Sequence, residues 1–145
     1  MRITSKGRYA VRVLVDIALS QGAPVNRRVL AARQGIPPDY LAQILQPLRA
    51  AGFVTGVKGP GGGYALARDA AEIRVGDVLR ATEGPIALSD CTAEDATIKC
   101  QFLETCKSRL FWEGLARVIA EYADGWTIAD LCDLPPHVTA QEPRA

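Results

Sequence analysis

The chain has 145 residues, a length typical of one compact unit or two small ones. Its first residues contain no apolar signal segment, and no uninterrupted apolar run approaches the roughly 18 residues that a membrane span needs. We therefore expect a cytoplasmic protein without a membrane anchor, in which the four cysteines stay reduced and are available for chemistry other than disulfide bonds.

The overall charge of +1 hides a strong asymmetry between the two halves of the chain. Residues 1–75 hold eleven Lys and Arg against four Asp and Glu, a net charge of +7, whereas residues 76–145 hold six against twelve, a net charge of −6. This asymmetry is typical of a nucleic-acid-binding part joined to a part with another task. A chance imbalance between two solvated surfaces explains the charges equally well when they are considered alone.

The first predicted helix starts after Thr4 or Ser5, either of which can cap it, and ends by Gly22. Its apolar residues form two stripes at helical spacing, so the helix is expected to have neighbours on two sides. The main stripe consists of Ala10, Val13, Leu14, Ile17 and Ala18.

Two more helices follow at close spacing. A short one starts after Asn26 and ends at Gly35, and the next one starts at Pro37-Pro38. Pro47 is expected to kink or shorten this third helix. Two helices joined by a tight turn, with polar side chains on the outer face of the second, are typical of a helix-turn-helix that enters the major groove, although an ordinary helical bundle fits equally well. The face predicted to be buried consists of Leu41, Ile44, Leu45 and Leu48.

Residues 53–69, "FVTGVKGPGGGYALARD", predict a strand, a glycine-rich turn and a second strand, which together form a wing. Lys58 and Arg68 flank the turn, and glycines let backbone N–H groups come close to phosphates. A nucleotide-binding loop is disfavoured because Tyr64 occupies the place of the last glycine in G-x-G-x-x-G.

The second half is expected to contain a short strand at 73–75, a helix at 76–83 and a longer helix at 108–124. The longer helix has two apolar stripes, and one chain of this size has little left to cover both. We therefore expect one stripe to pack on a second copy of the chain, and burial against the first helix is the alternative. The stripes are Phe111, Leu115, Val118 and Tyr122, and Trp112, Ala116, Ile119 and Ala123.

Cys91, Cys100 and Cys106 lie in a polar segment with the spacing C-x8-C-x5-C. A structural zinc site usually uses close C-x2-C pairs, which are absent from this sequence. Iron–sulfur clusters accept thiolates from loops of varied spacing, so a cluster fits the pattern, and unligated or redox-switching thiols remain the alternative. An enzyme is not indicated, because the lone His137 lies near the end of the chain and no nucleophile–base pair can be identified.

Several motifs resemble one known family. They are "MRITSKGRYAVRVLVDIAL", "GI" with "YL" four residues on, "LRAAGFV" and "VKGPGGGY", and the resemblance extends to about Leu131. The chain is similar to the winged-helix transcription regulators that include IscR, NsrR, RirA and CymR. The resemblance implies a mainly α fold with a small β-hairpin wing, a long dimerisation helix, a homodimer on double-stranded operator DNA, and an iron–sulfur cluster on Cys91, Cys100 and Cys106.

The chain departs from the family pattern in four places. The histidine that is the fourth ligand in IscR-like proteins is replaced by Arg109, and the N-terminal acidic ligand of some NsrR-like members by Arg8. Ala42 replaces the recognition-helix glutamate of IscR-like proteins, so the DNA targets need not be theirs, while the longer first cysteine gap and "ILQPL" are closer to RirA. The fourth ligand stays open, and a 4Fe–4S cluster is slightly favoured over 2Fe–2S. The candidates are solvent, Asp90, Glu94, Asp95, Glu104, Cys132 and His137.

The predicted organisation is a winged helix-turn-helix domain at 1–83, a cluster-bearing segment at 84–107, a dimerisation helix with a short C-terminal element at 108–134, and a disordered tail at 135–145. The expected function is a regulator, a repressor or an activator, whose cluster reports iron, redox or nitric oxide status. The alternative is a CymR-like repressor of sulfur metabolism genes without a cluster, controlled by thiol oxidation or a partner protein.

The predicted DNA contacts fall into two groups. Tyr40, Gln43 and Arg49 are expected to reach bases or the groove, and Gln43 can pair bidentately with adenine. Phosphate contacts are expected from Arg2, Lys6, Arg27, Arg28 and Lys58, and Asp39, Gly59, Gly61 and Gly62 complete the predicted interface.

Overall fold

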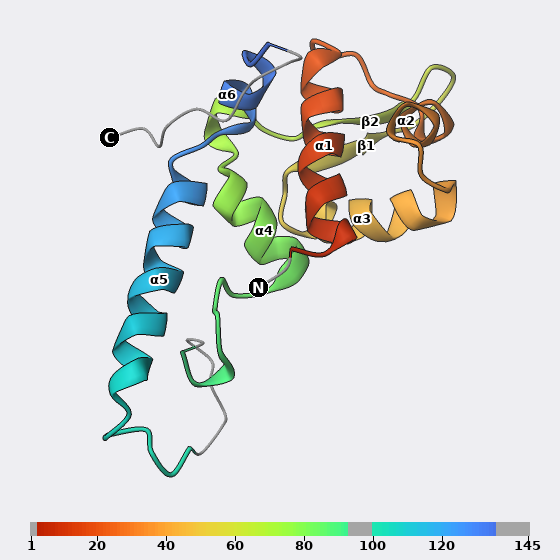
Figure 1. Ribbon diagram of the computed structural model, residues 1–145. Helices are drawn as coiled ribbons and strands as arrows, with labels where there is room; N and C mark the ends of the chain where they lie inside the picture. Colours follow the sequence, from red (N-terminus) through yellow and green to blue (C-terminus); the bar gives the residue numbers. More distant parts are fainter. Residues whose placement is uncertain (1–2, 93–99, 136–145) are drawn as a thin grey trace.

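The computed structural model describes residues 3–92 and 100–135. Helices α1 to α4, the β1–β2 hairpin and α6 gather into one body, which we call the head, and α5 extends from it as an arm (Figure 1). Residues 100–106 lead into the outer end of this arm, and the short turn Asp90–Thr92 packs against it. The predicted fold class, mainly helical with a small hairpin, is confirmed.

Helix α1 (Ser5–Leu19) is the centre of the head, since α2, α3, α4, α6 and β2 all pack against it. The side chain of Thr4 caps the helix by accepting the N–H of Lys6 at 3.1 Å. The chain leaves the helix through Gln21 and Gly22, both with positive φ. The predicted main stripe is buried at Ala10, Val13, Leu14 and Ile17, with the partly buried Ala18 packed against the core.

Helices α2 (Arg27–Gln34) and α3 (Pro38–Ala50) form the predicted pair. Asn26 caps α2 through the N–H of Arg28, and Gly35 ends it in the left-handed conformation. Of the two outcomes expected at Pro47, shortening of α3 is wrong, because the helix continues to Ala50, and a kink stays a prediction. Proline removes one backbone donor, whereas burial of Leu48 holds the last turn in place and the Ala51 N–H still reaches the Pro47 carbonyl at 2.9 Å.

The wing consists of β1 (Val54–Val57) and β2 (Gly63–Leu66), which pair antiparallel. A bridge ties the wing to the residue before the α2 cap, because Val25 and Tyr64 exchange two N–H to carbonyl bonds of 2.9 Å. The wing is therefore anchored to the helix-turn-helix rather than projecting freely.

The strand expected at 73–75 is not formed. A short 3₁₀ turn, η1 (Ala70–Glu72), comes first, Arg74 makes only an isolated bridge to Thr127, and Val75 already starts α4 (Val75–Glu83). The apolar pattern predicted burial correctly, since Ile73 is fully buried. No strand forms, because the stretch pairs with the chain near Thr127 through one isolated bridge only.

The arm, α5 (Lys107–Asp124), is joined to the head near its C-terminal end. The N–H of Val75 donates to the Trp126 carbonyl, and the N–H of Ile128 donates to the Ile73 carbonyl, both at 2.9 Å. The chain then enters α6 (Ile128–Cys132), whose first residue is fully buried in the head core. The core therefore includes residues from both ends of the chain. Its largest fully buried side chains include Leu14, Leu30, Leu41, Ile44, Leu48, Ile73 and Ile128.

Candidate DNA interface and cysteine segment

The outer face of α3 carries polar side chains along its length. Asp39, Gln43, Gln46 and Arg49 are exposed, while the opposite face is buried in the core. Gln46 lies three residues after Gln43 and three before Arg49, so it belongs to the same exposed polar face. The sequence places it on that face, although it is not among the predicted DNA contacts.

Tyr40 differs from its neighbours on α3. Its ring meets that of Tyr9 edge to face, with the centroids 6.1 Å apart, and the residue is half-buried. Tyr9 in turn lies under the guanidinium of Arg12, 5.1 Å from its ring centroid. Tyr40 therefore helps to pack α3 on α1, and a DNA contact from it stays a prediction.

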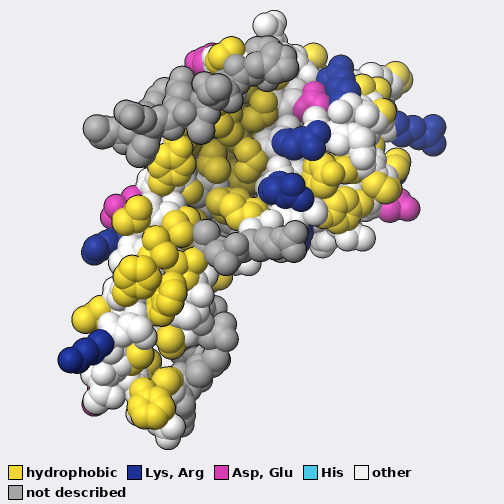
Figure 2. All heavy atoms as spheres, in the orientation of Figure 1, with side chains coloured by type: hydrophobic (Ala, Val, Ile, Leu, Met, Phe, Trp, Pro, Cys, Tyr) yellow, Lys and Arg dark blue, Asp and Glu magenta, His cyan; other side chains and the backbone are white. Residues whose placement is uncertain are grey.

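The predicted phosphate-binding residues that the structure describes all lie on the head. Arg27 and Arg28 are exposed at the start of α2, Lys58 is exposed at the wing, and Lys6 is half-buried in the first turn of α1. Figure 2 shows basic side chains on the surface of the head, while hydrophobic side chains run down the arm. Arg2 lies outside the described residues.

A shallow groove of about 480 Å³ separates the second half of α3 from the wing, so that the two candidate DNA-binding elements border one depression. The Val25–Tyr64 bridge brings the start of α2 to the same wing. Helix α3, the N-terminus of α2 and the wing are thus neighbours. The groove is lined by Ala42, Leu45, Gln46, Arg49, Ala50 and Tyr64.

The glycines of the wing are required by its own geometry. Gly59 and Gly61 have positive φ, at 99° and 75°. A Cβ at Gly62 would meet the carbonyl oxygens of Val57 and Gly59, and the Gly62 N–H is already bonded to the Gly59 carbonyl at 2.9 Å. A phosphate contact of the glycine backbone therefore stays a prediction, and the turn alone explains these residues.

Cys91, Cys100 and Cys106 lie in the chain segments that precede α5. Cys91 lies in a short 3₁₀ turn, η2 (Asp90–Thr92), which packs against α5, and Cys106 is the N-cap residue of that helix. Cys100 begins a turn in which its carbonyl accepts the N–H of Leu103 at 3.1 Å and the Phe102 carbonyl accepts the N–H of Cys106 at 2.8 Å. All three are free thiols of intermediate exposure.

The surroundings of Cys106 stabilise its thiolate form relative to a free thiol. Hydrogen bonding to Ser108, with a sulfur–oxygen distance of 3.2 Å, lowers the pKa of the thiol, helped by the backbone N–H and the positive charge of Arg109. Cys91 also has a hydroxyl neighbour, since its sulfur lies 3.4 Å from Ser89 Oγ. The thiolate is the form that binds metals, and hydrogen bonds to its sulfur tune a bound cluster.

Arg109 occupies the position where IscR-like proteins place a ligating histidine. Its guanidinium pairs with Glu113 at 2.6 Å and donates to the Leu103 carbonyl at 3.3 Å. A guanidinium cannot ligate a metal, so this residue braces the turn between Cys100 and Cys106 instead.

The fourth cysteine is kept apart from the other three. Cys132 packs against the head core, its thiol points to the Val15 carbonyl at 3.9 Å, and burial raises its pKa. It follows α5, whereas Cys106 precedes this helix of 18 residues, which is about 27 Å long. Of the other candidate ligands, Asp90 lies in η2, Glu104 is exposed, and Glu94, Asp95 and His137 lie outside the described residues. Within residues 3–92 and 100–135, no group of three or more His, Cys, Asp or Glu side chains is arranged to hold a metal ion.

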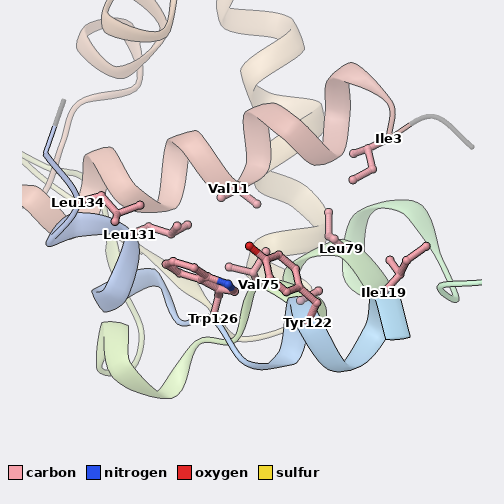
Figure 3. A pocket seen from close by; sticks show the side chains of 10 residues that line it. Ile3, Val11, Val75, Leu79, Ile119, Tyr122, Trp126, Leu131 and Leu134 are labelled. Atoms are coloured by element: carbon pink, nitrogen blue, oxygen red, sulfur yellow. The ribbon is translucent and has the colours of Figure 1, made fainter. Parts of the chain in front are cut away.

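An apolar pocket of about 480 Å³ lies where α1, α4, α5 and α6 meet (Figure 3). It continues into the outer stripe of α5, where Phe111 is 62% exposed and Val118 57%. An apolar surface thus runs from the head along the arm. The pocket is lined by Ile3, Val11, Val75, Leu79, Ile119, Tyr122, Ala123, Trp126, Leu131 and Leu134. None of the helices in the described part of the chain has the length and hydropathy needed to cross a membrane.

Comparison with known proteins agrees with this architecture. The model of the Rrf2 family, described as "Iron-dependent Transcriptional regulator", matches residues 3–134. The regulator IscR of Serratia proteamaculans is 41% identical over 132 residues, which cover 90% of this chain and 79% of that protein. IscR of Yersinia enterocolitica is 40% identical with the same coverage.

Two solved structures share the fold. T. potens IscR superposes with a TM-score of 0.75 at 34% identity, covering 98% of this chain and 94% of that one. CymR, the global cysteine regulator of B. subtilis, superposes with a TM-score of 0.74 at 29% identity, covering 91% and 96%. The chain therefore belongs to the Rrf2 family and is a winged-helix, DNA-binding transcriptional regulator of the IscR type, not an enzyme.

Proposed function

We propose that this regulator works as a homodimer whose DNA binding is controlled by an iron–sulfur cluster held by Cys91, Cys100 and Cys106. The observation that carries the proposal is that all three thiols are free and lie in the chain before α5, with Cys106 at the helix N-cap. The donor set fits a cluster, because it combines three free thiols, a lowered pKa at Cys106, and hydroxyl groups beside Cys91 and Cys106.

The cluster, when bound, would supply a centre that responds to iron supply, redox state or nitric oxide. Arg109 leaves the usual fourth position without a ligand, and Cys132 lies at the other end of α5. Solvent or a carboxylate, with Glu104 the described and exposed candidate, completes the ligand set. Incomplete protein ligation would make a cluster of either type labile, as suits a sensor. We favour 4Fe–4S slightly over 2Fe–2S.

On the DNA side, α3 would enter the major groove with Gln43 directed to adenine, and the wing and the start of α2 would contact the backbone through Lys58, Arg27 and Arg28. These proposed contacts are supported by two observations: the side chains are exposed, and α3, the wing and the start of α2 are neighbours on the head.

The dimer proposal is supported by the uncovered apolar surface. The outer stripe of α5 remains exposed when α4 and η2 have packed against the helix, and the pocket beside it is almost entirely apolar. A second copy related by a two-fold axis would cover both and place two recognition helices about one DNA turn apart. In this arrangement residues 1–83 read DNA, residues 84–107 hold the cluster, and α5 joins the subunits.

A CymR-like repressor without a cluster is the second candidate. It is favoured by one observation, that Arg109 stands where a ligating histidine is expected, and it is consistent with the structural similarity to B. subtilis CymR. Thiol oxidation or a partner protein would then control DNA binding.

Anaerobic purification distinguishes the two candidates. We expect a brown wild-type protein with iron and sulfide, characteristic absorption and Mössbauer spectra, and DNA binding that differs between loaded and cluster-free samples. Cys100→Ala, measured on parallel samples, should lose the cluster and behave as the cluster-free protein. A colourless wild-type protein that resists reconstitution and binds DNA fully would favour the CymR-like candidate.

A further inference from the structure

The carboxylate of Glu83 joins two segments that lie far apart in the chain. One oxygen, Oε1, accepts both the hydroxyl of Thr4 at 2.6 Å and the N–H of Gly7 at 2.8 Å. Thr4 is the cap of α1, and the first turn of this helix contains no acidic residue of its own. Glu83, the last residue of α4, therefore supplies the negative charge that a helix N-terminus favours.

The contact leaves no free space. Gly7 is buried in the first turn of α1, and a Cβ added to it would meet Oε1, Cγ and Cδ of Glu83. Glycine is a poor helix former, so its presence here is explained by the closeness of the carboxylate rather than by the helix itself.

Glu83 also stands where the cysteine segment leaves the head. Gly84 follows with a φ of 89°, then Pro85, and Cys91 comes eight residues after Glu83. A small cavity of about 200 Å³ lies where α4 passes into the following loop. It is lined by residues from four parts of the chain: Ile3 before α1, Leu79 of α4, residues 84–87, and Ile119 of α5. The start of α1, the start of the cysteine segment and the arm therefore meet at Glu83.

We propose that Glu83 is a positioning residue that couples the cysteine segment to the DNA-binding head. When residues 84–92 are held in one arrangement, the Glu83 carboxylate caps α1. When they are reordered, the cap loosens and the first turn of α1 shifts, together with the basic residues Lys6 and Arg8. This inference rests on the proposed cluster function, and the coupling must act in both directions, from cluster to DNA and from DNA to cluster.

The test compares DNA affinity with and without the cluster in four proteins. Wild type, Glu83→Gln, Glu83→Ala and Glu72→Gln are purified anaerobically, and each is titrated with a DNA fragment selected by the wild-type protein. Glu72 is an exposed carboxylate of the head, so its replacement controls for the lost charge. Couplings between sites typically change affinity about 5- to 150-fold. The quantity compared is the ratio of the DNA affinities measured with and without the cluster. We expect wild type and Glu72→Gln to share one such ratio. Glu83→Ala should bring the ratio within about twofold of one, and Glu83→Gln should give an intermediate ratio.

Gly7→Ala perturbs the same contact from the other side while improving the helix propensity of α1, so it checks the result if Glu83→Ala does not fold. It should also lower the ratio, and thermal unfolding shows which variants are folded. A wild-type ratio kept by both folded Glu83→Gln and folded Gly7→Ala overturns the role of Glu83 and leaves the proposed function intact. A ratio of one in the wild type overturns the proposed function and this inference with it.

Discussion

Arg80 and Asp124 form a forked ion pair that clamps α4 to the C-terminal end of α5. Both guanidinium Nη atoms donate to the carboxylate, one to each oxygen, at 2.7 Å. The hydrogen bonds from Arg80 lower the pKa of Asp124, and those to Asp124 raise the pKa of Arg80. Arg74 adds a hydrogen bond to the backbone carbonyl of Asp124. The arm is thus held to the head by side chains as well as by the backbone.

This pair predicts a pH-dependent contribution to stability. The side chains are 38% and 36% exposed, so solvent screening limits the effect of Asp124→Asn at pH 7 to roughly 0.5–1 kcal/mol. Because folding lowers the pKa of Asp124 below 3.8, its contribution is present above about pH 4 and is lost as pH falls through the folded-state pKa. Urea unfolding at pH 7 and pH 3 should show a smaller difference from wild type at pH 3 than at pH 7. Asp77→Asn, which removes the 3.1 Å contact of Arg80 within α4, should have a smaller effect, and an equal loss at both pH values would contradict the assignment.

The wing offers a matched pair of glycine substitutions. A Cβ at Gly63 would meet the carbonyl of Val25 and the N atom of Asn26, which are backbone atoms of the bridge to the wing, whereas Gly56 in the facing strand has open space around it. We expect Gly63→Ala to lower the free energy of unfolding by roughly 1–3 kcal/mol and Gly56→Ala to change it by less than about 0.5 kcal/mol. Chemical unfolding followed by circular dichroism measures both, and equal effects would show that the wing tolerates a side chain at the bridge.

The outer stripe of α5 predicts how the dimer can be separated. Val118 is exposed in the single chain, so Val118→Asp should leave the head folded while placing a charge in the middle of the proposed interface. Light scattering at micromolar concentration should report a monomer for Val118→Asp and a dimer for wild type. Arg117→Asp, on the polar side of the same helix, should remain a dimer. A dimeric Val118→Asp would move the interface elsewhere.

The cysteines are expected to divide into ligands and a core residue. Cys106→Ala should lose iron and sulfide after anaerobic purification, because Cys106 is one of the three proposed ligands. Cys132→Ala should retain both, since its thiol packs on the head near Val15. Iron and sulfide analysis per chain gives the answer, and loss of iron from folded Cys132→Ala would make Cys132 a ligand.

Lys58 at the wing predicts a change in salt dependence. Lys58→Ala should weaken binding to all DNA sequences and reduce the slope of log affinity against log salt by about 0.9 per subunit, because one phosphate contact is lost. Lys107→Ala, which removes an exposed charge from the arm, should leave the slope unchanged. An unaltered slope for Lys58→Ala would remove this residue from the interface.

Local sequence signals identified most of the elements, because caps and turns depend on neighbouring residues. Asn26 and Gly35 bound α2 as expected from their side-chain and backbone preferences. Pro47 does not end α3, because the burial of Leu48, which is a tertiary effect, outweighs one missing donor.

The contacts that organise the candidate sites were not accessible in the same way. Gly7 looks like a weak point in a helix until Glu83 is placed beside it, 76 residues further along the chain. Cys132 is different, because the run "WTIADL" before it favours a core thiol over a ligand, and the residue does pack against the head core.

Helix α5 is attached to the head at its C-terminal end, so a small rotation there moves its N-terminal end much further. The helix is about 27 Å long, so a tilt of roughly 5° at the clamped end displaces the opposite end by roughly 2 Å. Under the proposed function, small substitutions around Gly76, whose missing side chain lets Asp124 approach α4, would therefore change the amplitude of the response. Sensitivity to the signal and choice of DNA target would then be separately adjustable, since neither the cysteines nor the residues of α3 need change.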